Sequence, residues 1–411
     1  MLRSWRAAAA RFRALLRSDA AGVRAGFVAL LLSSGGDLLA GLTLGSITGT
    51  LEALPGLLVL VPAAIGMRGN VFGALGSRLS TAIHTGTFHL SRRQDTIVGQ
   101  NLAASLSLSL SISLVLAVLA KVISVGFGLE HTISIADFVV ISVIGGFLSS
   151  IVVMGITVGV ASLSVRRDWD LDNVAAPIVT AAGDMVTLPA LFLATYLVGL
   201  AWVTPVVAVL CAVAGVVALV LSIRSRSPIL RRIARESLPV LALAGTIDIV
   251  AGLTIEKRFT SFLVYPALLV LVPPFLEDSG ALGGILSARV STKLHLGILE
   301  PGGRRLRAVV EDVLLVFMYA VPVFLLLGVS ADIAAAIAGL TSPGSLQMIA
   351  VSMFAGAIAT TFAVLVGFYG AVATFRLGLD PDNHGIPIVT SSLDLLGALA
   401  LILAIVTLGL T

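Results

Sequence analysis

Two aspartates close two copies of one short motif. The motif reads DLDNVAAPIVTAAGD from residue 170 and DPDNHGIPIVTSSLD from residue 380, and it ends on Asp184 and Asp394. Spacings of four, three and four residues place one amide, one proline, one hydroxyl and one carboxylate on a single helical face in each copy. The polar members of these faces are Asn173, Thr180 and Asp184, and Asn383, Thr390 and Asp394. Their oxygens are the hard ligands that Mg²⁺ prefers.

Both aspartates lie deep inside long apolar runs. Each is about eleven residues, or roughly 17 Å of helix, from the start of its run. An ionisable group at that depth costs about 2.5 kcal/mol or more in a bilayer and usually has a function. Two carboxylates that face each other repel unless a cation lies between them, so Asp184 and Asp394 predict a divalent-cation site. The alternative is a pair of protonated aspartates that only hold helices together.

Four further acids inside apolar runs are accessory candidates for a cation site or pore, namely Asp37, Asp248, Glu277 and Asp278. Asp37 and Asp248 occupy equivalent positions, and we expect them to bind an ion, line an outer vestibule or cap a broken helix. Glu277 and Asp278 have no acidic counterparts in the other copy. They are expected to pair with an arginine or to bind a coupling cation.

The second apolar run of each half is rich in proline and glycine. It contains Pro62 before the sequence MRGN in one half, and Pro273 and Pro274 before EDSG in the other. Such residues allow a membrane helix to break where it lines a cavity, so we expect a turn at these sequences. Asn70, the last residue of MRGN, is therefore a further pore candidate.

The amino-acid composition of the chain indicates the environment in which these residues lie. Hydrophobic residues make up 58% of the 411 and charged residues only 12%, and the mean hydropathy is +1.08. Ordinary soluble proteins carry about twice that share of charge, so a soluble enzyme and a disordered chain are excluded. The sequence predicts an all-α polytopic membrane protein with about eleven transmembrane helices. The apolar runs cover residues 21–49, 53–83, 97–127, 133–164, 173–200, 203–223, 238–259, 262–291, 306–329, 345–376 and 383–410.

Basic residues mark alternate connections between these runs. The connections 84–94, 166–172, 224–237, 293–307 and 376–383 carry most of them, whereas those near 51, 130, 202 and 330–344 carry none. Among the remaining connections only 256–260 contains any, Lys257 and Arg258. By the positive-inside rule this pattern predicts a cytoplasmic N-terminus and an external C-terminus in the plasma membrane. Residues 1–20 form a basic amphipathic segment expected on the cytoplasmic membrane surface.

The chain contains an internal repeat. An offset of 211 residues pairs Asp37 with Asp248 and Pro62 with Pro273, and an offset of 210 pairs Asp184 with Asp394. Because six crossings separate the two starts, both copies have the same orientation, with a pseudo-two-fold axis along the membrane normal. The expected organisation is a five-helix repeat over 21–200, a linker helix and loop over 201–237, and a second five-helix repeat over 238–411.

The runs PGLLVLVPAAIGMRGN and PALLVLVPPFLEDSG, with the duplicated aspartate motif, resemble the MgtE family of divalent-cation transporters. The duplicated form is most similar to the eukaryotic solute-carrier magnesium transporters. The resemblance implies a Mg²⁺ channel or transporter in which the fifth-span aspartates, here Asp184 and Asp394, hold the ion between two parallel units. MgtE itself also has cytosolic sensor domains, which this sequence lacks, so gating by such domains is not expected.

We therefore expect a transporter rather than an enzyme. Mg²⁺ is the expected transported ion, Mn²⁺ and other divalent ions are further candidates, and no organic cofactor is expected. The partners are the lipid bilayer and divalent cations, with no nucleic acid, and the built-in pseudo-dimer is compatible with a monomer. A Na⁺- or H⁺-coupled Mg²⁺ exchanger is the alternative, motivated by Glu277 and Asp278. An intramembrane Mg²⁺-dependent lipid-phosphate enzyme is a remote one, since such chemistry needs acids clustered near the interface.

Overall fold

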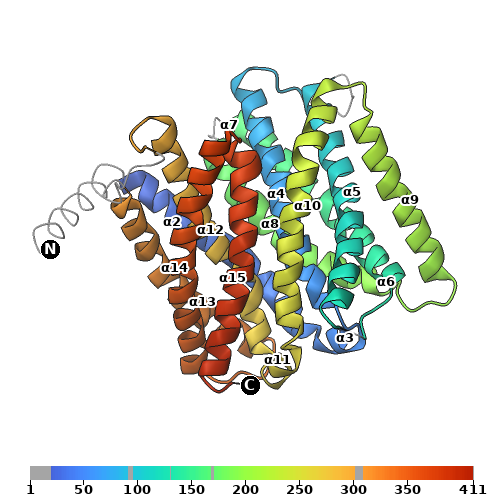
Figure 1. The fold of residues 1–411 in the computed structure, drawn as a ribbon, viewed down its shortest axis with the longest axis vertical. Helices are drawn as coiled ribbons and strands as arrows, with labels where there is room; N and C mark the ends of the chain where they lie inside the picture. Colours follow the sequence, from blue (N-terminus) through green and yellow to red (C-terminus); the bar gives the residue numbers. More distant parts are fainter. Residues whose placement is uncertain (1–19, 91–95, 130, 168–170, 301–308, 411) are drawn as a thin grey trace, which may run out of the picture.

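The computed structural model describes residues 20–90, 96–129, 131–167, 171–300 and 309–410, and all of its regular elements are helices (Figure 1). The predicted basic segment lies outside these residues except for Ala20. The first half contains α2 (Ala20–Ser46), α3 (Thr48–Ala53), α4 (Leu57–His84), α5 (Ile97–Gly126), α6 (Ile135–Val140), η1 (Ile141–Gly145), α7 (Gly146–Arg167) and α8 (Leu171–Thr195). Then follow α9 (Val203–Ile223), α10 (Pro228–Glu256), α11 (Phe259–Val264), α12 (Ala267–His295), α13 (Val310–Ile337), α14 (Ser345–Leu377), η3 (Pro381–Gly385) and α15 (Ile386–Thr407).

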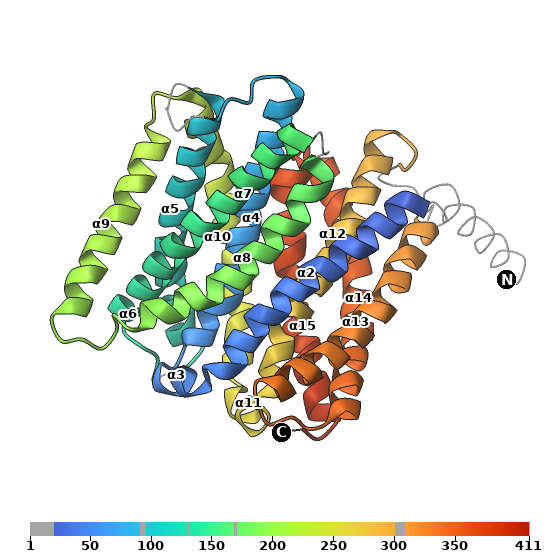
Figure 2. The same cartoon turned by 180° about the vertical axis from the view of Figure 1, so that it is seen from behind.

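The predicted number of spans is confirmed. Within the described ranges, eleven helices are long and apolar enough to cross a membrane, with α6, η1 and α7 forming one continuous span. The short helices α3 and α11 occupy equivalent places, each between the first and second spans of its half. Linker helix α9 lies at the edge of the bundle against α5 (Figures 1 and 2).

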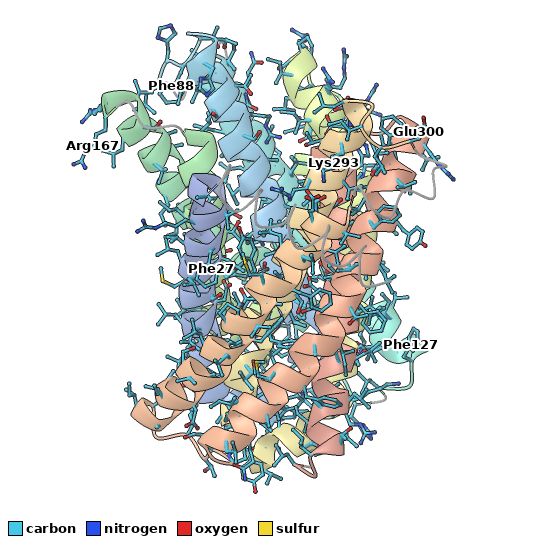
Figure 3. All side chains as sticks on the ribbon, turned by 90° about the vertical axis from the view of Figure 1, so that its left-hand side faces the viewer. Phe27, Phe88, Phe127, Arg167, Lys293 and Glu300 are labelled. Carbon is cyan, nitrogen blue, oxygen red and sulfur yellow. The ribbon has the colours of Figure 1, made fainter. Side chains whose placement is uncertain are left out.

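The two ends of the bundle differ in charge. Arg167 and Lys293 lie toward one end, here termed the basic end, and Phe127 lies toward the other (Figure 3). The C-terminus lies at the end opposite the connection that follows α4 (Figure 1). Lys121, a basic residue near the opposite end of α5, donates from its amine to the Thr132 hydroxyl at 2.8 Å, so its charge is held by the adjacent connection.

The second spans α4 and α12 are uninterrupted helices. The prediction that Pro62, Pro273 and Pro274 lead into a turn is therefore wrong, because all three prolines lie inside continuous helix. A proline in a helix leaves the carbonyl four residues earlier without its N–H donor. In this chain those carbonyls include the ones of Leu58 in α4 and Val270 in α12, and both face the opposite half.

The halves meet where the first span of one packs against the second span of the other. Helix α2 contacts α12, and α10 contacts α4. A Cβ atom at Gly41 of α2 would lie 2.1 Å from the Val270 carbonyl oxygen, and one at Gly252 of α10 would lie 2.6 Å from the Val59 oxygen and 2.7 Å from the Leu58 oxygen. Gly41 and Gly252 are repeat-related, as are Val270 and Val59, so these two contacts follow one pseudo-two-fold relation. Glycine lets the backbones approach the freed carbonyls closely, as small residues do in membrane interfaces.

We predict that Gly41→Ala and Gly252→Ala each destabilise the fold. The added methyl group must displace backbone atoms, and such overpacking costs about 1–3 kcal/mol. Thermal unfolding in detergent measures the effect. Gly73→Ala and Gly284→Ala are matched controls, because these repeat-related glycines have no atom within 4 Å of an added Cβ. Equal melting temperatures for the Gly41 and Gly73 variants would contradict the proposed tight interface.

Candidate cation site

Helices α8 and α15 bring the fifth-span aspartates into the interior. Asp184 is 0% exposed and Asp394 is 7% exposed. Helix α8 packs against α2 and α4, and α15 packs against α10 and α12. Each aspartate therefore has the first span of its own half on one side. Both carboxyl groups are buried between helices, and the side chains that face each aspartate differ from those expected from the sequence.

The carboxyl group nearest each fifth-span aspartate comes from the first span of the same half. Asp37 lies within hydrogen-bonding reach of Asp184, and Asp248 lies within reach of Asp394. Asp37 and Asp248 are both 0% exposed. Because Asp37 lies inside the continuous helix α2 and Asp248 inside α10, the helix-cap interpretation of these two residues is wrong, and the outer-vestibule interpretation stays a prediction. The structure contains two repeat-related aspartate pairs, here termed pair A (Asp37 and Asp184) and pair B (Asp248 and Asp394).

Small residues allow the first spans to approach this closely. A Cβ atom at Gly36, the neighbour of Asp37, would lie 2.8 Å from the Cβ of Ala181 in α8. A side chain at residue 36 would push α2 away from α8 and separate pair A. Gly36 therefore has a packing role at this contact.

Glu277 on α12 lies within electrostatic range of both pairs. Its carboxyl group interacts electrostatically with the four aspartates of both pairs. The repeat places Gly66 at the equivalent position of α4. A Cβ atom at Gly66 would lie 3.2 Å from Asp248 Oδ2 and 3.9 Å from Asp394 Oδ2. At this position one half therefore has a carboxylate, and the other has a glycine that packs closely against pair B.

A cavity between the second spans lies beside Glu277. It is lined by three pairs of repeat-related residues from α4 and α12, together with Glu277 and Asp394. The three pairs are Val61 and Val272, Pro62 and Pro273, and Ile65 and Leu276. Because equivalent residues face each other, the cavity lies on the pseudo-two-fold axis. It approaches the carboxylates from the end of the bundle opposite to the basic end.

Asp278 has different surroundings from its neighbour Glu277. It is 0% exposed, and its Oδ1 accepts a hydrogen bond from the Ser34 hydroxyl of α2 at 2.6 Å. The repeat replaces this contact by an apolar one, since the equivalent residues are Met67 and Gly245. A Cβ atom at Gly245 would lie 3.7 Å from the Met67 methyl group. Asp278 therefore joins α12 to α2, and the predicted arginine partner is not its hydrogen-bond donor.

Fewer contacts define the positions of the predicted hydroxyl and amide groups. A Cβ atom at Gly69 would lie 3.9 Å from the Thr180 methyl group, and one at the equivalent Gly280 would lie 3.5 Å from the Thr390 Cβ. The Thr390 hydroxyl donates to the carbonyl of its own helix, at Pro387, over 3.1 Å. Asn173 lies in α8 and Asn383 in η3, but both side chains fall outside the described residues. Asn70 lines a separate cavity nearer the basic end.

The aspartates of pairs A and B have few hydrogen-bond donors. In the described part of the chain no hydrogen bond of normal geometry reaches the buried oxygens of Asp37, Asp184 and Asp248, although the Ser33 hydroxyl lies near Asp37 and the Ser391 hydroxyl near Asp248. Two carboxylates that face each other are both acceptors, so a proton or a cation must lie between them to remove the repulsion. Among the described residues, no three His, Cys, Asp or Glu side chains converge into a direct metal-binding group. This geometry suits an ion that retains part of its water shell.

A buried cation near pair A was missed by the sequence reasoning. Arg68 of α4 is 1% exposed, and its Nε, Nη1 and Nη2 atoms donate to Ser149, Ser109 and Ser113 at 3.0, 2.8 and 3.1 Å. A Cβ atom added at Gly183, the neighbour of Asp184, would lie 3.4 Å from the Cβ of Arg68. The guanidinium itself points to α5 and α7. The signal in the sequence is the combination of an arginine inside one apolar run with serines at alternate positions of another apolar run, which can accept its hydrogen bonds.

Buried, pairwise related carboxylates between two parallel helical repeats define a membrane protein that transports cations. The MgtE family, described as divalent cation transporters, matches residues 61–194 and 272–404, which is more than half of the chain. The chain therefore belongs to the MgtE family. The two matched segments start and end at repeat-related residues, as the resemblance in the sequence indicated.

Curated relatives extend this similarity over most of the chain. Solute carrier family 41 member 3 of Rattus norvegicus is 27% identical over 90% of this chain and 84% of its own length. The Mus musculus member 3 is 28% identical over 83% and 73% of the two chains, and Homo sapiens member 2 is 26% identical over 84% and 63%. No solved structure gives a significant match.

We predict that Asp278 can be replaced together with its partner. Ser34→Ala alone removes the donor to a buried carboxylate and should cost about 1–3 kcal/mol of stability. The double variant S34G D278M copies the apolar contact of the other half and should melt close to the wild type. Thermal unfolding in detergent compares the two. A double variant less stable than Ser34→Ala would show that the Asp278 carboxylate has a further buried partner.

Proposed function

We propose that this protein passes Mg²⁺ across the plasma membrane along the interface between its repeats, with Asp184 and Asp394 holding a largely hydrated ion near mid-membrane. The observation that carries the proposal is that each of these aspartates faces another buried carboxyl group, Asp37 beside Asp184 and Asp248 beside Asp394. A divalent cation compensates both charges of a pair at once, which a single proton does not.

The geometry supports a sequence of steps for the ion. The axial cavity between α4 and α12 leads it to Glu277 and Asp394. Pairs A and B then provide carboxylate oxygens on both sides of the interface, joined by Glu277. Thr180 and Thr390 lie toward the basic end of the aspartates and are suited to contact the waters of the ion, with Asn173 and Asn383 at the inner mouth.

Mg²⁺ fits this arrangement because of its coordination habits. It binds oxygen atoms, loses its waters reluctantly and is commonly held by one or two carboxylates with several waters retained. Carboxylate oxygens also suit Mn²⁺. We therefore propose Mg²⁺ as the principal transported ion, with Mn²⁺ accepted at the same oxygens.

Glu277 favours a second candidate, a Na⁺- or H⁺-coupled exchanger. A fifth carboxylate between two pairs gives the site capacity for a monovalent ion when the divalent ion has left. Mg²⁺ flux into proteoliposomes distinguishes the two modes. Flux driven by voltage alone identifies a channel, and flux that requires an opposing Na⁺ or pH gradient identifies an exchanger. In an exchanger, Glu277→Gly, which copies Gly66, should remove the requirement for an opposing Na⁺ or pH gradient. A channel has no such requirement for the substitution to remove.

A lipid-phosphate enzyme fits the structure less well. A phosphate headgroup lies at the membrane surface, whereas the carboxylates of pairs A and B are buried within the helices. Membership of a transporter family supports the same preference.

We also propose a cytoplasmic location for the basic end and an external location for the C-terminus, with the chain divided at about residues 20, 200 and 237. A reporter that folds only outside the cell should be active when fused after Thr411 and inactive when inserted after Arg226. Activity at both positions would contradict this topology.

We predict that Asp184→Asn and Asp394→Asn lower Mg²⁺ flux in proteoliposomes, and that the double variant reaches the background of empty vesicles. Each change removes one charge that holds the ion while keeping the shape of the side chain. Glu52→Gln is the control, since Glu52 is an exposed acid near α3. Undiminished flux through a folded double variant would rule out this assignment.

A further inference from the structure

Arg78 of α4 is a partly buried arginine near the basic end of the bundle. Its Nε atom is buried without an acceptor among the described residues, and its Nη2 atom reaches the Ser105 hydroxyl only at 3.4 Å. The ion pairs of the described part of the chain do not include it. A buried N–H of a charged group is costly unless it meets an acceptor, and a buried charge is costly unless it is paired. Arg78 therefore has room for a further, negatively charged partner.

The other half supplies an acid at the equivalent place. Arg289 is the repeat counterpart of Arg78, and its Nε atom donates to the Asp312 carboxylate at 2.8 Å. Asp312 is 0% exposed, and Lys293 bonds its other oxygen. One arginine of the repeat thus has a built-in carboxylate at the same nitrogen that lacks an acceptor in the other.

The counterpart of Asp312 in the first half is Asn101. The offset of 211 residues holds on both sides of this span, because repeat-related glycines of positive φ follow the helices there, namely Gly86 and Gly297, and Gly128 and Gly339. Asn101 is 3% exposed, its amide nitrogen donates to the Ile97 carbonyl at 2.9 Å, and its Oδ1 is buried without a donor. A neutral amide does not balance a guanidinium, so the charge of Arg78 stays uncompensated.

Arg78 also lines a cavity between the halves. The walls of this cavity come from α4 and α5 of the first half and from α10 and α15 of the second. Its other polar residues are Asn70 and Ser237, and the remaining ones are apolar: Val71, Ala74, Leu108, Leu241 and Pro387. None of the described lining residues is acidic. The cavity has room for about one water-sized ligand.

The chemistry of this lining selects an anion. A guanidinium has only donors and always carries its charge, and a hydroxyl group and an amide can each donate as well. A cation would be repelled by Arg78, and a water molecule would accept from its Nε atom without balancing the charge. A phosphate or sulfate ion is too large for this space. A halide ion accepts charge-assisted hydrogen bonds from all three groups and carries the single charge that is missing.

We propose that this cavity binds one small monovalent anion, such as chloride, between Arg78, Asn70 and Ser237. The anion has the electrostatic role toward Arg78 that the Asp312 carboxylate has toward Arg289. Because its ligands lie on α4 and α10, it links the two repeats at the basic end. The site is separate from pairs A and B, and it does not depend on which ion the protein transports.

Thermal unfolding in detergent tests the site. At equal ionic strength the wild type should melt about 2 °C or more higher in sodium chloride than in sodium gluconate, whose anion is too bulky for the cavity. Arg78→Gln removes the charge and should abolish this difference. Asn101→Asp copies the carboxylate of the other half and should abolish it too, so the test stands even where Arg78→Gln does not fold.

Arg232→Gln is the matched control. It removes an exposed arginine of α10 and should keep the chloride effect. General effects of the salts on stability would be the same in all four proteins. Equal melting temperatures of the wild type in the two salts, or a chloride effect that persists in the Asn101→Asp protein, would overturn the inference.

Crystals of the wild type in sodium bromide locate the anion directly. Bromide should give an anomalous scattering peak within hydrogen-bonding distance of the Arg78 guanidinium. A cavity that holds only water, without such a peak, would overturn the inference. Neither measurement involves Mg²⁺ flux, so a failure of the proposed function and a failure of this inference are distinguished.

Discussion

A carboxylate at the centre of a membrane is stable only when a proton or a cation lies beside it. This constraint explains most of the arrangement of the chain. Four aspartates meet in pairs A and B, and Glu277 lies within electrostatic range of both pairs. Helices must approach closely for the pairs to form, which is why Gly36 packs on Ala181 and why Gly41 packs on the carbonyl of Val270. The packing of the bundle thus serves to bring charges together that would otherwise separate.

The repeat provides a symmetric frame, and single substitutions within it provide the differences between the halves. The contact of Ser34 with Asp278 at the α2–α12 interface corresponds to that of Gly245 with Met67 at the α10–α4 interface, so a hydrogen bond replaces an apolar contact of similar volume. Glu277 corresponds to Gly66, which packs closely against Asp248. In a dimer of identical subunits each such change would occur twice. Fusion of the halves into one chain allows a single acid to lie near the axis.

The sequence predicted the features that depend on long averages over the chain. Eleven spans, the parallel repeat and the depth of Asp184 follow from hydropathy, the position of basic residues and the repeat offset. The pairing of Asp37 with Asp184 did not follow, because it depends on the rotation of α2 against α8, which a one-dimensional pattern does not contain. The expected turn after Pro62 was wrong for a related reason. A proline in a membrane helix is tolerated where a neighbouring backbone covers the freed carbonyl, and that neighbour belongs to the other half.

Arg68 is a buried charge with a structural role in this fold. Three serines from α5 and α7 accept its hydrogen bonds, so every nitrogen of the guanidinium has a partner. Asp184 lies next to Gly183, which packs against Arg68, yet no serine, threonine or backbone N–H in the described chain donates to Asp184. A chain able to satisfy one buried charge with hydroxyl groups has the means to satisfy its neighbours in the same way. The lack of donors at the aspartates is therefore best explained by a mobile partner that supplies the missing positive charge, and a divalent cation with its water shell matches two carboxylates in both charge and bonding.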